Sequence, residues 1–169
     1  MRLSASLMPE FDQEMANTRR TLERVPSDKF AWKPHEKSFS FKQLANHLAR
    51  VPGWGVATLK TDSMDLDPEK GEFIPPPEEE TVDGVLAAFD QGVAEFRAAL
   101  EDASDEEMMG VWTLRNAGDT LLTMPRVAVV RGMIMNHMIH HRGQLTVYLR
   151  LNGVPVPALY GPSADEGGR

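Results

Sequence analysis

The chain has 169 residues, of which 41% are hydrophobic and 25% are charged, and its formal net charge is -7. These values fit one globular domain, residues 1–169, that buries a single core. An acidic chain without a basic stripe repels phosphate backbones, so nucleic acid is not an expected partner.

The sequence contains no cysteine. Disulfides, thiolate metal sites and a cysteine nucleophile are therefore excluded, and histidine and carboxylate side chains are the candidate metal ligands. No stretch reaches the roughly 20 apolar residues of a membrane-spanning helix, and the N-terminal residues lack the apolar run of a signal peptide. We therefore expect a soluble, cytoplasmic protein with a small-molecule partner and no contact with a membrane.

Helical periodicity begins near the start of the chain. Residues 5–25 carry apolar side chains at helical spacing and end before a proline, which predicts an amphipathic helix. After a loop, Ser40 and Gln43 form a capping-box pattern that predicts the start of a second helix, which reaches about residue 62. Pro52 interrupts this second pattern, so we expect a kink or a break there.

The segment 62–80 is acidic and rich in proline, which is typical of a stiff, solvated connection. Stretched out, a segment of this length reaches well beyond about 30 Å. It can therefore cross the length of a helix bundle and join two parallel helices. Thr81 then caps a third predicted helix, whose apolar residues repeat at helical spacing up to Leu100.

The end of the chain predicts a hairpin and a long helix. Residues 108–124 resemble two short strands around a turn at 116–119, and a pair this short must pack on helices to be stable. The last helix opens near Pro125 and ends at residues 152–153, and residues 161–169 form a tail. The predicted fold class is all-α, a four-helix bundle with a small β-hairpin before the last helix.

Histidines stand in the last helix where apolar residues are expected. Steps of three and four residues place His137 and His141 on the core-facing seam, with His140 to one side. His47 lies on the apolar face of the second helix. An i, i+4 pair of imidazoles can share a metal ion, and His47 can add a third ligand from across the bundle. The alternative is that these are ordinary core histidines that hydrogen-bond within the protein.

Four polar residues near the histidines carry two interpretations each. Gln144, one turn beyond His141, either orients a ligand or touches substrate, or else forms a plain hydrogen bond between helices. Asn46 and Asn136 flank candidate ligands and share this ambiguity. His140 belongs either to the groups that support the ligands or to the solvent-exposed surface.

The remaining residues of this region have structural interpretations. Gly143 is expected to permit close helix packing, since glycine within a helix costs about 1 kcal/mol relative to alanine. Arg142 is expected at the surface or in a salt bridge. The methionines at 133, 135 and 138 point in different directions around the helix, which favours flexible core filling over a copper site.

Two stretches, NHMIHHRGQLTVYLRLNGVPVPALYGPSADE and SFSFKQLANHLARVPGW, resemble the DinB-like (DinB/YfiT) superfamily. The pattern of that superfamily is one histidine on the second helix and a late His-x-x-x-His-Arg-Gly-Gln run, and the resemblance covers nearly the whole chain. It implies a bundle of up-down-down-up topology, often dimeric, with a three-histidine divalent metal site that opens into a cleft. On this pattern the ligands are His47, His137 and His141. Pro52 departs from it and leaves the aim of His47 open.

The resemblance also implies a class of function. Similar proteins include thiol-dependent S-transferases that use low-molecular-weight thiols, and proposed hydrolases. We therefore expect a homodimeric, divalent-metal-dependent enzyme that acts on a small molecule, with a low-molecular-weight thiol as candidate cosubstrate. Nickel, zinc, manganese and iron all remain candidates for the metal. The alternative is a noncatalytic metal- or small-molecule-binding module. Three protein ligands favour an enzyme, because closed structural sites usually supply four.

Overall fold

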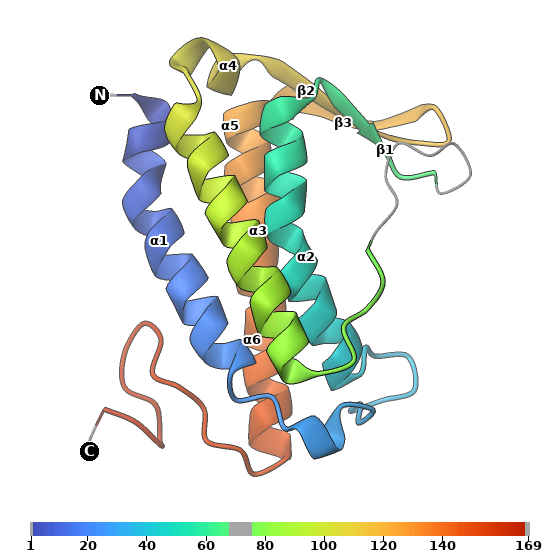
Figure 1. The fold of residues 1–169 in the computed structure, drawn as a ribbon, viewed down its shortest axis with the longest axis vertical. Coiled ribbons are helices and arrows are strands. Elements are labelled where there is room, and N and C mark those ends of the chain that lie inside the picture. Colours follow the sequence, from blue (N-terminus) through green and yellow to red (C-terminus); the bar gives the residue numbers. More distant parts are fainter. Residues whose placement is uncertain (1, 68–75, 168–169) are drawn as a thin grey trace.

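The computed structural model describes residues 2–67 and 76–167, and most of them are helical. Four long helices lie side by side and bury one shared hydrophobic core (Figure 1). They are α1 (Leu3–Leu22), α2 (Phe41–Lys60), α3 (Val82–Asp102) and α6 (Asn136–Leu151). A short turn of 3-10 helix, η1 (Ser27–Lys29), lies between α1 and α2. Among the described helices, none combines the length and the apolar character that crossing a bilayer requires.

The predicted helix starts agree with local hydrogen bonds. The Ser40 hydroxyl accepts a bond from the Gln43 N–H at 3.2 Å, and the Gln43 side chain accepts one from the Ser40 N–H at 2.9 Å, which confirms the capping box of α2. The Thr81 hydroxyl accepts from the Gly84 N–H at the start of α3. A second capping box, at Ser104, opens the short helix α4 (Asp105–Met109), which the sequence analysis missed.

The predicted break at Pro52 is wrong, because α2 continues through this residue to Lys60. Proline removes one backbone hydrogen bond and crowds the preceding turn, but Pro52 is buried against α3. A β-carbon on Gly92 of α3 would lie 3.3 Å from the Pro52 side chain, and one on Gly55 would lie 2.4 Å from the Phe96 ring. Close packing between α2 and α3 at these glycines stabilises the helix across its proline.

A three-stranded sheet stands at the end of the bundle where α2 finishes (Figure 1). The predicted hairpin is confirmed as β2 (Val111–Asn116) and β3 (Asp119–Pro125), which pair antiparallel. A third strand, β1 (Ser63–Asp65), pairs parallel to β2, with Met64 opposite Leu114. The expectation of a purely irregular connection is therefore wrong at residues 63–65, whereas residues 68–75 of that connection lie outside the described part of the chain.

Asp65 attaches β1 to the hairpin turn. Its carboxylate accepts hydrogen bonds from the backbone N–H groups of Ala117 at 2.9 Å and Gly118 at 2.8 Å. Both turn residues have positive φ, 53° and 88°, as a tight hairpin turn requires. Met64 packs with Trp112 in a second, smaller apolar cluster beneath the sheet.

The predicted last helix contains a change of helix type. It begins as α5 (Arg126–Ala128), continues as the π-helical segment η2 (Val129–Met135), and becomes α6. A π-helical segment has more residues per turn than an α-helix. Every residue beyond it is therefore rotated relative to the predicted stripe, by about 100° for one extra residue.

This rotation moves the core-facing seam at the start of α6 by one position. The buried side chains of α6 are Met138, Arg142, Leu145, Tyr148 and Leu149. Met138 and Arg142 take the places expected for His137 and His141, whereas Leu145 and Tyr148 stay on the predicted stripe. His137 and His141 immediately precede two of them and are only partly buried. The prediction that both histidines occupy the core seam is therefore wrong: they lie at its border, where a small molecule can reach them.

Candidate metal centre

Three histidines from two helices meet beside the core. His47 comes from α2, and His137 and His141 come from α6 one turn apart. One ring nitrogen from each lies within 4.8 Å of the other two. The Nε2 atoms of His47 and His137 are 2.7 Å apart. The three residues that the sequence singled out are therefore brought together, and His47 is aimed at its predicted neighbours despite Pro52.

The surroundings keep the three imidazoles neutral. Burial lowers the pKa of His47 from 6.5 to about 4, and repulsion from His141 and His137 adds to this effect. Burial likewise lowers the pKa of His137 to about 4, again with repulsion from His141. Burial also lowers the pKa of His141, and the hydrogen bond that this ring donates to Gln144 opposes the effect. A neutral imidazole keeps a lone pair on one nitrogen, and that form binds metal ions.

Gln144 orients His141. Its Oε1 atom lies 2.8 Å from Nδ1 of His141, and its Nε2 atom lies 3.1 Å from Nε2 of His140. Since an amide oxygen only accepts hydrogen bonds, Nδ1 of His141 carries the proton and Nε2 keeps the lone pair. Gln144 thereby fixes both the ring orientation and the tautomer of His141, and it links this ring to His140.

The two asparagines make other contacts. Asn46 is buried, donates to the Glu79 carbonyl at 3.1 Å and accepts from the Glu79 N–H at 2.7 Å. These bonds fasten α2 to the segment that leads into α3. Asn136 is exposed and accepts a hydrogen bond from Arg131. The described hydrogen bonds of both asparagines therefore support the backbone and surface, and not the three histidines.

Two aromatic rings that the sequence analysis did not assign flank the histidines. The Trp54 ring centroid lies 5.4 Å from that of His47 and 5.7 Å from that of His137. Phe39 lies 5.8 Å from His47 and 6.4 Å from His141. Trp54 follows His47 by seven positions, two helical turns, and this spacing could have predicted the contact. Phe39 precedes α2 in a loop and carries no comparable signal.

Arg142 occupies the core and not the surface. Its side chain is 1% exposed and pairs with Glu14 of α1, with an N–O distance of 2.5 Å. It also donates to the Thr18 hydroxyl and to the Tyr160 hydroxyl. The surface alternative predicted for Arg142 is wrong, and the salt-bridge alternative is confirmed. This cluster joins α6 to α1 and to the C-terminal segment.

Other expectations for this helix have mixed outcomes. Gly143 is exposed, and a β-carbon added there would meet nothing within 4 Å, so the predicted close packing at this glycine is wrong. Met135 and Met138 are fully buried and fill the core as predicted, whereas Met133 is 37% exposed. The predicted tail folds back on the bundle, where Glu166 pairs with Arg20 at 3.1 Å.

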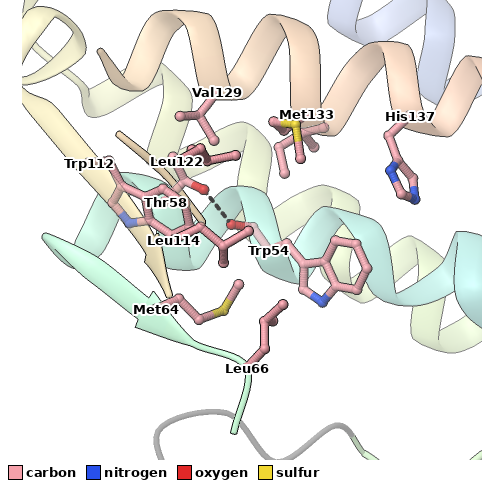
Figure 2. Close-up of a pocket in the computed structure, with 11 residues that line it drawn as sticks. Trp54, Thr58, Met64, Leu66, Trp112, Leu114, Leu122, Val129, Met133 and His137 are labelled. Carbon is pink, nitrogen blue, oxygen red and sulfur yellow. Dashed lines mark hydrogen bonds between the residues drawn. The ribbon is translucent and has the colours of Figure 1, made fainter. Parts of the chain in front are cut away.

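An apolar cavity opens directly beside the centre. Its volume is about 250 Å³, and His137 forms part of its wall together with Trp54 and Met133. Figure 2 shows His137 at one end of the cavity and the sheet residues at the other. His137 therefore connects the histidine cluster to a space that can hold a small molecule.

Comparison with known proteins agrees with this architecture. Residues 1–167 match the DinB family. The protein YrdA of Bacillus subtilis (strain 168) is 22% identical over 159 residues, which cover 94% of this chain and 89% of YrdA. A DinB-like protein of Bacillus cereus ATCC 10987 superimposes with a TM-score of 0.69 at 21% identity, over 91% of this chain and 95% of the other. The DinB-like protein YjoA of Bacillus subtilis also gives 0.69 at 21% identity, over 90% and 96%. The predicted resemblance is confirmed.

Proposed function

The chain belongs to the DinB family, and on that premise we propose that it is a divalent-metal-dependent S-transferase that joins a low-molecular-weight thiol to a small electrophile. The observation that carries this proposal is the convergence of three neutral imidazoles at the end of an apolar cavity. Three ligands leave a coordination position for a reactant.

The donor set fits a divalent metal. Two nitrogens at 2.0 to 2.1 Å from a tetrahedral ion are about 3.3 Å apart. The nitrogens of His47, His137 and His141 lie within 4.8 Å of one another, and the shortest separation, 2.7 Å, needs only a small opening. Imidazole suits zinc, nickel and iron, so the proposal covers the metal site but not the identity of the ion.

The chain's own residues have distinct tasks in this mechanism. A divalent ion, when bound, lowers the pKa of a coordinated thiol or water. Gln144 holds His141 in the tautomer that presents Nε2. Trp54 and Phe39 pack against the imidazoles and help to hold their ring orientations. The thiol releases its proton to solvent, its sulfur bonds to the electrophilic carbon, and the leaving group departs with the bonding electron pair.

A hydrolase is the second candidate, because the open position also suits a water molecule. Water attack on a carbonyl generally calls for a positioned general base. Within the described residues, the group of potential ligands consists of the three histidines and includes no carboxylate. A bound ion would lower the pKa of either nucleophile, but a thiol starts from a pKa of about 8.5 and water from about 15.7, so the thiol would ionise with less help from a base. The thiol reaction is therefore the better-supported form of the proposal, and a noncatalytic binding module is what absence of turnover would indicate.

Three further features belong to the proposal. The up-down-down-up bundle is supported by the colours of Figure 1, in which α1 and α6 run one way and α2 and α3 the other. A homodimer and a cytoplasmic location follow from the sequence expectation. Light scattering of the purified protein measures its mass in solution. A mass equal to that of one chain would contradict the homodimer.

The decisive experiment compares metal content and turnover. Untagged wild type purified without added metal and then titrated with zinc or nickel is expected to bind about one equivalent. His137→Ala is expected to bind none, whereas His140→Ala, in the neighbouring exposed histidine, keeps the ion. The loaded wild type is then tested with cysteine or glutathione and an alkyl halide. Absence of metal binding in the wild type would overturn the metal centre, and binding without turnover would leave a binding module.

A further inference from the structure

The cavity beside His137 has walls from three parts of the fold. α2 and η2 form one side, and the sheet with the residue after β1 forms the other (Figure 2). The lining residues are Trp54, Thr58, Met64, Leu66, Trp112, Leu114, Leu122, Val129, Met133, Ile134 and His137. The cavity therefore depends on the packing of the sheet against the bundle.

Its walls select against charge. None of the lining side chains is an acid, a lysine or an arginine. The Thr58 hydroxyl donates to the Trp54 carbonyl at 2.9 Å, and the Trp112 N–H donates to the Thr61 hydroxyl at 3.4 Å, so both groups already have partners. Away from His137, a charged group buried here would lose hydration without compensation. The occupant that these walls favour is uncharged and apolar.

Its volume sets a size. An engineered apolar cavity of about 150 Å³ in another protein binds benzene. A volume of about 250 Å³ therefore accommodates a substituted benzene ring or a branched alkyl group. Met133 and Leu66 lie at its rim, 37% and 40% exposed, and the flexible methionine side chain can move aside for entry.

We infer that this cavity binds the uncharged apolar part of the substrate, a substituted phenyl or branched alkyl group. His137 belongs both to the cavity wall and to the histidine centre, with its Nε2 atom 2.7 Å from that of His47. A group seated in the cavity therefore presents its attached electrophilic carbon at the histidines. The inference rests on the proposed function for the reaction, but binding in the cavity does not depend on a metal ion.

The first test measures binding by the metal-free protein. Ethylbenzene is the probe and benzoate is its charged counterpart, and NMR of the methionine methyl groups is the readout, because Met64 and Met133 line the cavity. Saturable shifts of these two methyl groups with ethylbenzene, and none with benzoate, are expected. No saturable shift with ethylbenzene, or equal shifts with benzoate, would overturn the inference.

Matched substitutions on β3 locate the binding. Leu122→Trp fills the cavity, whereas Leu121→Trp places the same side chain at the neighbouring position, which is 56% exposed and outside the lining. Leu122→Trp is expected to weaken ethylbenzene binding by at least about tenfold, and Leu121→Trp to change it by less than about twofold. Met133→Phe narrows the cavity from the helix side. It serves as the alternative test variant if Leu122→Trp does not fold. Equal affinity in the filled and control variants would contradict the assignment.

Turnover of an apolar and a polar electrophile tests the cavity assignment separately from the S-transferase proposal. With one thiol and loaded protein, Leu122→Trp is expected to lower kcat/KM for benzyl bromide about tenfold and to leave that for iodoacetamide unchanged. Equal losses for both electrophiles would overturn the cavity as the apolar subsite. Lack of turnover of either electrophile by the wild type would contradict the S-transferase proposal and leave the binding result standing.

Discussion

His141 and Arg142 are neighbours in sequence but belong to two very different polar clusters. In the Arg142 cluster, Arg142, Glu14 and Thr18 are buried and the exposed Tyr160 covers them from outside. Glu14, Thr18 and Tyr160 accept the hydrogen bonds of Arg142. The histidine cluster brings like groups together: the Nε2 atoms of His47 and His137 lie 2.7 Å apart, so one ring donates a hydrogen bond to the other. The ionic cluster around Arg142 stabilises the fold, whereas converging imidazoles form a site that a metal ion can complete.

The largest expected effect comes from breaking the Arg142 cluster. Glu14→Ala leaves the buried Arg142 guanidinium without its carboxylate, and we expect a loss of about 3 to 5 kcal/mol in the free energy of unfolding. Glu10→Ala, one turn earlier on α1, removes an exposed pair with Arg131 and is expected to cost at most about 1 kcal/mol. Urea denaturation measures both, and similar losses would contradict the structural role of the buried pair.

The second prediction is that metal ions stabilise the protein through the histidine cluster and not through the Arg142 cluster. A ligand that binds only the folded state at 100 times its Kd stabilises it by about 2.7 kcal/mol. Wild type is therefore expected to gain thermal stability with zinc or nickel, and His47→Ala is expected to gain none. Glu14→Gln keeps the three histidines, so it should still respond to metal from its lower baseline. A metal-dependent gain in His47→Ala would show that the ion binds elsewhere.

The third prediction concerns the orientation of His141. Gln144→Ala removes the hydrogen bond to Nδ1 of this ring, and loss of such a supporting group typically costs about 10 to 100-fold in metal affinity. Isothermal titration measures the change. Gln144→Glu retains an acceptor and is expected to recover most of the affinity. Asn136→Ala, on the exposed side of α6, is the control and is expected to bind metal like the wild type.

The last prediction is a pH dependence of the metal-free protein. The pKa values of His47 and His137 are about 4 in the folded state and near 6.5 when unfolded. Between these values the unfolded chain binds more protons, so the free energy of unfolding falls as the pH falls from about 6.5 to about 4. Solvent screening reduces the effect at these partly exposed rings. In the double variant His47→Gln/His137→Gln, the free energy of unfolding should change less between about pH 4 and about pH 6.5 than in the wild type. An equal change in both proteins would show that these two histidines are not the cause.

Local chemistry explains why several elements were predictable. The capping box at Ser40 and the threonine cap at Thr81 depend on residues three positions apart, and such patterns form wherever the sequence places them. The hairpin turn at 116–119 likewise follows from its Asn-Ala-Gly-Asp sequence, in which Gly118 readily adopts a positive φ. The pair His137 and His141 was found because i, i+4 spacing is a property of one helix. His47 was found from its place on the apolar face of another helix and from the resemblance to the DinB-like superfamily.

The errors arose where distant segments meet. Pro52 stays within a helix because α3 packs closely against it at Gly92. The strand at residues 63–65 exists because β2, far along the chain, offers it hydrogen bonds. The burial of Arg142 depends on Glu14, which lies 128 positions earlier. None of these partners is visible within a window of neighbouring residues.

Local periodicity and the chemistry of imidazole were enough to predict the long helices, the ligand types and the spacing that can hold a metal. The direction in which those histidines face depends on tertiary packing. The π-helical turns of η2 rotate α6 so that Arg142 enters the core and His137 borders a cavity. Core packing fixes that rotation, and packing energy depends on contacts between segments that are far apart in the chain.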